Sequence, residues 1–356
     1  MTLFVYGQQK QTPLKIGVIG LTHSHVHWVF GCDTDCNIEI VGIVEKDKAL
    51  AQKYADQYNF SMDLVYSSME ELFDHHTPEA VTAFGSTFEH LEVAQKAAPR
   101  GIHVMVEKPL AVNMDHARQM KALADKFNIH LLTNYETTWY PTTHKTYDLA
   151  KKTNAIGSLR KIIVNDGHKG PKKIGVNPEF LDWLTDPVKN GGGADFDFGC
   201  YGANLLTWFM EGQRPNSVTA VAKQLQAENN PKVEDESIII VQYDNLVAII
   251  QGSWNWPIGR KDMEIYGLKG ALYADNRNDL RIRIAKGYDG YDETKMTLNE
   301  RPKPFNNPFA FLASVVKNEQ RLAPYDLSSL ENNLIVVEIL DAAKESAKNG
   351  KTIVFN

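Results

Sequence analysis

The chain has 356 residues, of which 43% are hydrophobic and 23% are charged, and its formal net charge at pH 7 is -6. A chain of this length exceeds what one hydrophobic core usually supports, so two domains are the default expectation. The acidic balance excludes the basic surface needed to bind nucleic acid or an anionic membrane, which leaves a small molecule or a second copy of the chain as the expected partner.

The first seven residues are apolar and precede a polar run, a pattern that resembles the tail of a secretory signal without its basic beginning. The segment is too short to be a complete signal. We therefore expect a cytoplasmic protein, and a periplasmic one if Met1 to Gly7 is the remnant of a signal. No apolar run reaches the roughly 18 residues of a membrane span.

Short β-branched runs alternate with amphipathic stretches from Leu14 to about residue 134. Strands separated by helices form right-handed βαβ units around a parallel sheet. We therefore predict a Rossmann-type dinucleotide-binding domain over residues 14–134. Its expected strands are Lys15–Ile19, Ile38–Glu45, Ala80–Phe84, His103–Val106 and His130–Thr133, and its expected helices are Lys48–Tyr58, Met69–His75, Glu89–Ala98 and Met114–Phe127.

The turn after the first strand is the place where such a domain holds the pyrophosphate of its cofactor. Of the three glycines in the usual pattern only Gly20 is present, and Thr22 and His25 fill the second and third positions. A threonine hydroxyl and the rings of His23 and His25 can still hydrogen-bond an anion, so these residues remain cofactor candidates. The loop by itself is equally compatible with a lost cofactor.

The histidines and cysteines near this loop could suggest a metal site or a disulfide. His23, His25 and His27 allow a His-x-His metal site, but no further ligands fit one, and no metal is predicted. Cys32 and Cys36 would share a helix face, and the three cysteines of the chain lack the spacing of a disulfide framework or a zinc site, so we interpret them as reduced or buried thiols.

Glu45 ends the second predicted strand, where an acidic residue binds the ribose 2′-hydroxyl of NAD and repels the 2′-phosphate of NADP. The neighbouring Lys46 weakens this preference. We predict NAD as the cofactor, with NADP less favoured; the alternative is that Glu45 is a solvated strand end.

Lys108 follows the fourth predicted strand and precedes a proline. Pro109 has a fixed φ and no N–H, so the chain must leave the strand in one direction. Lys108 is therefore expected at the carboxyl edge of the parallel sheet, where ligands bind in open α/β folds.

After Pro141 most predicted strands follow one another without helices, which indicates an antiparallel sheet. We predict a substrate-binding and oligomerisation domain over residues 135–356, built on a large, mainly antiparallel open sheet, so the fold class is α/β plus α+β. The expected helices are Thr142–Thr153, Tyr201–Met210, Pro308–Asn318 and Leu327–Lys348, and the expected strands are Leu159–Asp166, Ser217–Gln224, Glu236–Tyr243, Leu246–Trp254, Asp262–Gly267, Ala271–Ala274, Leu280–Ile284 and Thr352–Phe355.

One face of this sheet should be partly apolar, formed by alternate residues that include Ile238, Ile240, Ile250 and Trp254. We expect that face to pair with another copy, which gives a homodimer or homotetramer.

Two segments in this order resemble the Gfo/Idh/MocA family of sugar and polyol oxidoreductases: Glu107-Lys108-Pro109 with its preceding strand, and NGGGADFDFGCYGANLLTWFM at residues 190–210. The resemblance runs from about Lys15 to beyond Trp254. In the second segment Asp197 and Gly199 match the family pattern, and Asn204 fills its last polar position. Tyr201 stands where many members carry histidine, which is similar to the branch that contains glucose-fructose oxidoreductase and dihydrodiol dehydrogenase.

The resemblance implies hydride transfer between a nicotinamide and a CH–OH group of a sugar or polyol. It implies Tyr201 as the general acid/base and Lys108 as the group that lowers the pKa of Tyr201 and contacts the substrate; the alternative for Tyr201 is packing. The candidate substrate contacts are Asp197, Asn204, His168, Lys169, Trp183 and Tyr135, and the candidate cofactor contacts are Gly20, Thr22, His23, His25, Glu45, Ser86, His90, Glu107 and Lys108.

The sequence departs from the family at two places near the expected site. Gly85-Ser86-Thr87, followed by His90, stands where the family usually has Thr-Pro-Asn before a histidine, and Glu136 stands where the tyrosine branch has an arginine. Both changes leave the substrate class and the direction of reaction open. Two other functions also stay open: an NAD-dependent glycosidase that acts by transient oxidation and elimination, with which a possible export signal is compatible, and a non-catalytic sugar or nucleotide sensor, suggested by Thr22 and His25 in the cofactor loop.

Overall fold

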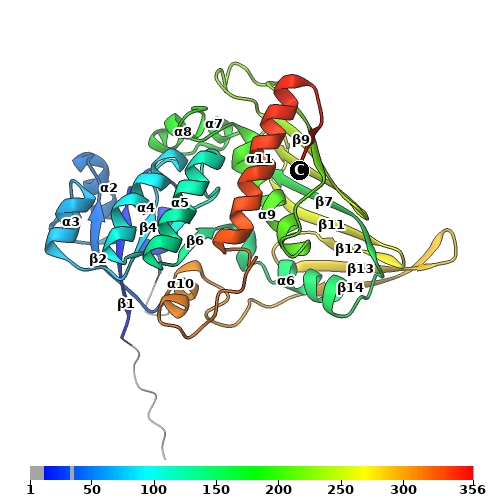
Figure 1. Cartoon of the computed structure of the whole chain (residues 1–356), viewed down its shortest axis with the longest axis horizontal. Coiled ribbons are helices and arrows are strands. Elements are labelled where there is room, and N and C mark those ends of the chain that lie inside the picture. Colours follow the sequence, from blue (N-terminus) through cyan, green and yellow to red (C-terminus); the bar gives the residue numbers. More distant parts are fainter. Residues whose placement is uncertain (1–11, 33–35, 356) are drawn as a thin grey trace, which may run out of the picture.

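The computed structural model describes residues 12–32 and 36–355 and contains two β-sheets (Figure 1). Met1 to Gly7 lies outside the described residues. The first sheet is parallel, and its strand order is β3-β2-β1-β4-β5-β6. This order confirms the Rossmann-type fold, whose chain reverses direction across the sheet between β1 and β4. The strands are β1 (Leu14–Ile19), β2 (Ile38–Val44), β3 (Val65–Tyr66), β4 (Ala80–Ala83), β5 (His103–Glu107) and β6 (Leu131–Asn134).

Helices cover both faces of the first sheet, which is why β4 and β6 are buried at every position. One face packs against α3 (Met69–His75), α4 (His90–Ala97) and α5 (Met114–Phe127). The other packs against α1 (Val26–Phe30), α2 (Lys48–Tyr58) and α10 (Pro308–Val316), so a segment far along the chain returns to close the first core.

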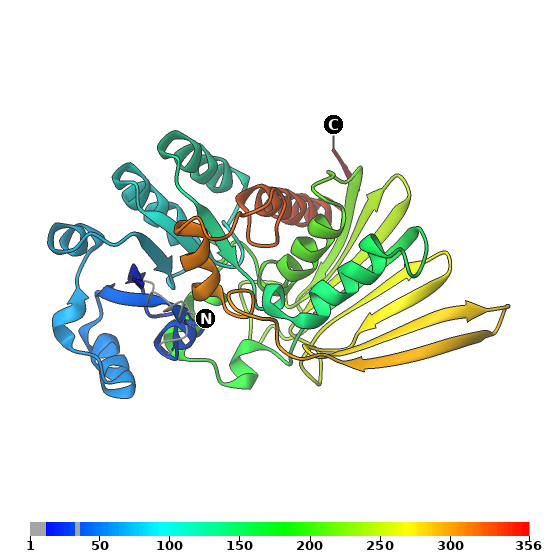
Figure 2. The ribbon, with the colours of Figure 1, turned by 90° about the horizontal axis from the view of Figure 1, so that it is seen from below.

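The second sheet has the order β14-β13-β12-β11-β7-β10-β9-β8-β15 and is antiparallel except for the pairing of β7 with β10. Its main helices are α6 (Pro141–Tyr147), α9 (Cys200–Phe209) and α11 (Leu330–Asn349), and Figure 2 shows helices on one face of this sheet with the other face bare. The strands are β7 (Leu159–Gly167), β8 (Ser217–Lys223), β9 (Glu236–Tyr243), β10 (Leu246–Ser253), β11 (Arg260–Gly267), β12 (Gly270–Ala274), β13 (Asp279–Lys286), β14 (Gly290–Thr297) and β15 (Ile353–Val354).

α11 joins the two halves because its sides belong to different cores. Leu330 and Val337 pack with the first sheet, whereas Ile339 and Leu340 pack with the second. Among the described residues, no helix combines the length and hydrophobicity that a membrane crossing requires.

The bare face of the second sheet corrects part of the expected apolar surface. Ile238 is exposed as predicted, together with Val247, but Ile250 and Trp254 are fully buried in the core. The reason is register: across the hairpin Ile250 lies opposite the buried Ile239, so it shares the inner face.

The interpretation of two cysteines was wrong. Cys32 and Cys36 form a disulfide. α1 ends at Phe30, so the two residues are not on one helix face, and their Cα atoms lie 5.9 Å apart, within the range a disulfide spans. Cys200 is a buried free thiol, as expected.

Several elements were not anticipated. They include the two-residue strand β3, the exposed strand β14, and two short helices, α7 (Pro171–Ile174) and α8 (Pro178–Leu184), in what the sequence suggests is a loop. The helix expected over residues 142–153 changes to π-helix geometry at Asp148.

Candidate active site

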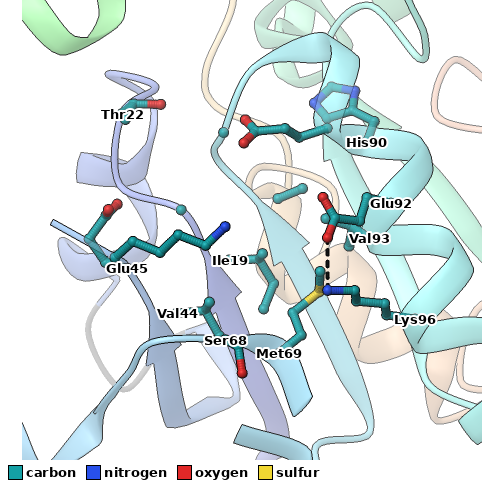
Figure 3. Close-up of a pocket in the computed structure, with 15 residues that line it drawn as sticks. Ile19, Thr22, Val44, Glu45, Ser68, Met69, His90, Glu92, Val93 and Lys96 are labelled. Carbon is teal, nitrogen blue, oxygen red and sulfur yellow. Dashed lines mark ion pairs between the residues drawn. The ribbon is translucent and has the colours of Figure 1, made fainter. Parts of the chain in front are cut away.

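A cleft of about 180 Å³ opens at the carboxyl ends of β1, β2 and β4 (Figure 3). Thr22 and His90 lie at one end of it, and Ser68 and Met69 at the other. The cleft sits at the point where the strand order reverses, between β1 and β4, which is where open α/β sheets bind nucleotides.

Gly20 is required where the two loops of this edge meet. Its φ is +80°, and a Cβ atom there would lie 2.8 Å from the backbone nitrogen of Gly85. A side chain at this position would therefore force the loops after β1 and β4 apart.

Thr22 is anchored rather than free. Its Oγ1 accepts a hydrogen bond from Trp183 Nε1 at 3.0 Å and donates one to the Phe84 carbonyl at 3.4 Å. Trp183 lies on α8, so this helix of the second half covers the loop that usually carries the second glycine. Trp183 was predicted as a substrate contact, and it lies against the cofactor loop.

His23 and His25 take part in a buried network. The His23 ring packs against Phe180 and its Nδ1 accepts the backbone N–H of His25 at 3.0 Å, so the proton is on Nε2, which has no partner among the described residues. His25 Nδ1 lies 2.8 Å from Glu107 Oε2, and Glu107 Oε1 accepts from Asn134 Nδ2 at 2.7 Å.

His23, His25 and Glu107 are also the residues that could form a metal site. Within the part of the chain that the structure describes, His23, His25 and Glu107 are close enough together to share an ion. The tautomer of His23 argues against this, because its open nitrogen carries a proton and is a donor. Burial lowers the pKa of His23 well below its usual value, so the ring is neutral, and it is the position of its proton that disfavours a metal.

Glu45 lines the cleft directly after β2. Its two oxygens accept the backbone N–H groups of Leu21 at 3.0 Å and Asp47 at 2.9 Å. Each carboxylate oxygen has a second lone pair, so it can accept a further hydrogen bond. Burial raises the pKa of Glu45 despite these donors.

Ser86 and His90 follow β4. The Ser86 N–H and hydroxyl both donate to Glu89 at 2.7 Å, which closes a capping box and uses the side chain structurally. His90 Nδ1 donates to the Leu110 carbonyl at 3.2 Å, and its buried Nε2 is an acceptor without a partner among the described residues. Burial lowers the pKa of His90 to about 4, so it is neutral at physiological pH.

Lys108 forms a buried ion pair at the end of β5. Its ammonium contacts Asp197 Oδ1 and donates to the Asp197 carbonyl at 3.0 Å, while Trp254 Nε1 donates to Asp197 Oδ2 at 2.9 Å. Burial disfavours the charged form of both groups, but the attraction between the two opposite charges is stronger. The pKa of Lys108 is therefore raised and that of Asp197 is lowered. The pair is therefore charged, and Asp197 holds Lys108 rather than standing free for substrate.

Tyr201 lies at the start of α9 with two lysine ammonium groups near its ring. Lys108 Nζ is 5.3 Å and Lys261 Nζ is 4.8 Å from the centre of its ring. Lys108 and Tyr201, about 90 residues apart in sequence, are thus brought together, although no hydrogen bond joins them.

The expected lowering of the Tyr201 pKa is not found. Burial, together with the negative charge of Glu136, raises the pKa of this phenol well above its ordinary value. Lys108 is neutralised by Asp197, which leaves it little capacity to stabilise a phenolate. Tyr201 is consequently a neutral phenol.

Lys261 on β11 was not found from the sequence. It pairs with Glu136, the residue that replaces the branch arginine, so the positive charge at this place comes from another strand. Burial disfavours ionisation of Glu136, but Lys261 and the Tyr140 hydroxyl outweigh it and lower its pKa to about 2. A charged lysine inside a strand carries no sequence signal beyond its polarity.

The remaining candidates fall in different places. His168 lines a second cavity beside Phe198, and its Nδ1 accepts the Gly170 N–H at 3.0 Å. Tyr135 is fully buried with its ring 5.5 Å from that of Tyr201. Lys169 is exposed and does not line this cavity. Asn204 is buried and donates to the Leu327 carbonyl at 2.8 Å, so it holds the chain before α11.

Comparisons with known proteins cover most of the chain. Residues 14–135 match the model of an oxidoreductase family with an NAD-binding Rossmann fold, and residues 150–273 match the GFO/IDH/MocA C-terminal domain. Trans-1,2-dihydrobenzene-1,2-diol dehydrogenase of Xenopus tropicalis is 25% identical over 273 residues, which are 76% of this chain and 73% of that protein. The alignments with two further curated relatives span only 52% and 64% of those proteins.

Solved structures show the same fold along the whole chain. GenD2 from gentamicin A biosynthesis, in complex with NAD, has a TM-score of 0.78 at 22% identity and covers 100% of both chains. Aldose-aldose oxidoreductase from Caulobacter crescentus, in complex with glycerol, has a TM-score of 0.78 at 18% identity and covers 96% of this chain and 100% of that one.

Proposed function

Because the chain belongs to the Gfo/Idh/MocA family of NAD-binding oxidoreductases, we propose that it interconverts a CH–OH group and a carbonyl on a sugar or similar polyol, with NAD as the cofactor. Residues 14–134 would hold the cofactor and residues 135–356 the substrate. The observation that carries this proposal is the meeting of Lys108, which follows β5 at the carboxyl edge of the parallel sheet, with Tyr201.

The residues of the cleft fit a dinucleotide. Glu45 offers carboxylate oxygens to ribose hydroxyls, and His90, which also lines the cleft, has a buried acceptor nitrogen without a partner among the described residues. Gly20 lets the loop after β1 pack closely against the loop after β4, because it has no side chain. A bound nicotinamide supplies the hydride acceptor or donor.

Tyr201 would exchange the proton of the substrate oxygen. As a neutral phenol it is already in the form that donates a proton to a carbonyl, so reduction needs no prior ionisation. Oxidation requires the phenol to lose its proton first. Lys108, kept charged and fixed by Asp197, would donate a hydrogen bond to the same substrate oxygen.

The substrate class rests on the relatives. Those named above include a diol dehydrogenase and an aldose-aldose oxidoreductase, names that point to a small hydroxylated molecule and to a sugar. A sugar or polyol is the substrate class that fits both names.

The test is a panel of sugars and polyols assayed for NAD reduction, and of the matching ketoses for NADH oxidation. We expect NADH absorbance to change with at least one of them and equilibrium titration to show NAD binding. Steady release of sugar from a glycoside without accumulation of NADH would favour the NAD-dependent glycosidase instead. Failure of both NAD and NADP to bind would favour a sensor.

A further inference from the structure

A second cavity, of about 320 Å³ and open to solvent, lies next to the reaction pair. Phe198 and Lys261 both line it. The Phe198 ring lies 5.7 Å from Lys108 Nζ, and Lys261 Nζ lies 4.8 Å from the Tyr201 ring. Lys108 and Tyr201 do not line this cavity themselves, but Phe198 and Lys261 contact them, so a molecule bound in the cavity would lie next to the reaction pair.

The wall of the cavity carries positive charge without negative charge. Arg260, Lys261 and Arg277 line it, and no aspartate or glutamate does. The carboxylates that pair with these cations are Asp262, Glu136 and Glu300, none of which lines the cavity. The surface that meets a ligand is therefore cationic, although the surrounding residues balance in charge.

Both arginines keep one side open. Arg260 donates from Nε and Nη2 to Asp262 at 2.6 and 2.7 Å, and Arg277 donates from Nε and Nη2 to Glu300 at 2.8 and 2.6 Å. Among the described residues nothing accepts a hydrogen bond from Nη1 of either arginine. Each guanidinium therefore has three N–H groups left for a ligand, two on Nη1 and one on Nη2.

The arginines are also held in place. The guanidinium of Arg260 lies 4.5 Å from the centre of the Trp256 ring, and that of Arg277 lies 5.1 Å from the centre of the Tyr140 ring. A planar guanidinium fixed by a carboxylate at one edge and a ring at one face loses little freedom when it binds an anion.

We propose that this cavity binds an anionic group of the substrate at Arg260 and Arg277, so that the substrate is an acidic sugar or polyol with one carboxylate or phosphate. This inference rests on the proposed function and specifies its substrate class. A cationic amino sugar is disfavoured by the same wall, and a neutral sugar does not require three cations.

The test compares matched substrates: glucose, galactose and mannose, the uronic acid of each, and the 6-phosphate of each. We expect kcat/KM for an anionic member to exceed that of its neutral parent at least 10-fold. Activity with the uronates alone would identify a carboxylate as the anion, and activity with the phosphates alone a phosphate. Equal kcat/KM across each set would overturn the inference.

Substitution of the two arginines tests whether they cause the preference for an anionic substrate. Arg260→Gln and Arg277→Gln should each lower kcat/KM for the anionic member by about 10- to 100-fold, mainly through KM, because a hydrogen bond to a charged group is lost. The matched control is Arg281→Gln: Arg281 has the same two-point pairing, with Asp275, and does not line the cavity.

A binding measurement separates the two proposals. Calorimetric titration of the wild type and the two arginine variants with glucuronate and glucose 6-phosphate needs no turnover. Binding that weakens in the variants, without any change in NADH, would uphold the anion site and count against the oxidoreductase reaction. Turnover that is unaffected by both arginine substitutions would uphold the reaction and refute the anion site.

Discussion

The replacement of Tyr201 by phenylalanine removes one oxygen atom from the centre of the proposed site. The hydroxyl accepts and donates no hydrogen bond among the described residues, and the ring contacts with Tyr135, Lys108 and Lys261 do not depend on it. We therefore expect the free energy of unfolding to change by less than about 1 kcal/mol.

The effect on the reaction should be far larger. Loss of a positioned proton donor lowers kcat by about 100- to 10,000-fold, which corresponds to roughly 3 to 5 kcal/mol of transition-state stabilisation. The affinity for NAD should be unchanged, because the hydroxyl is not part of the nucleotide cleft. The loss should appear in kcat more than in KM.

The assay is NADH absorbance under saturating cofactor, with NAD affinity from fluorescence titration and stability from urea unfolding. Tyr243→Phe is the matched control, since Tyr243 is also buried with an unpartnered hydroxyl and lies on β9, outside the cleft and the second cavity. Full activity in Tyr201→Phe, or an equal loss in Tyr243→Phe, would refute the role of the phenol.

Further predictions follow from charge and exposure. Because the pKa of Tyr201 is raised, kcat for oxidation should increase with pH from about 7 to 10 while kcat for reduction stays flat; a flat oxidation profile would contradict this. Glu45→Gln should reduce the preference for NAD over NADP by about 10-fold in kcat/KM, since the charge that repels a 2′-phosphate is lost. Ile238→Lys should turn the expected dimer into a monomer by light scattering, because this exposed residue lies on the bare face of the second sheet, whereas Leu268→Lys, also at an exposed position, should not. The pKa of buried His90 is lowered to about 4, so the unfolded chain binds a proton first, and the stability that depends on a neutral His90 is lost as the pH falls from about 6.5 to 4; His90→Gln should make this loss shallower in urea unfolding.

Much of the fold was predictable because its signals are local. The strands and most helices of the first sheet follow from the alternation of β-branched runs and amphipathic stretches. Among the described residues, the two-residue strand β3, the short helix α1 and the bounds of some elements differ from this expectation. The sequence does not predict the strand β14, because it is exposed on both faces and has no alternating apolar pattern. The disulfide was missed because its geometry depends on where α1 ends, and nothing in the spacing of Cys32 and Cys36 indicates that.

The candidate site was predictable in part. Lys108 and Tyr201 could be selected from two motifs, and the structure brings them together. Asn204 and Trp183 were predicted to contact the substrate, but both make structural hydrogen bonds. Asn204 donates to the Leu327 carbonyl before α11, and Trp183 donates to Thr22 in the cofactor loop. The pKa of Tyr201 could not be anticipated, since it depends on burial and on Glu136.

The sequence by itself determined the parallel sheet, the family and the lysine and tyrosine of the proposed reaction, because periodicity and short motifs are written within a few dozen consecutive residues. The tertiary structure alone decided which charges line the second cavity. Arg260, Lys261 and Arg277 come from β11 and the turn after β12, and their acidic partners lie behind them. Charge at a cavity wall depends on which partner of each ion pair points inward, and that is set by packing between distant strands.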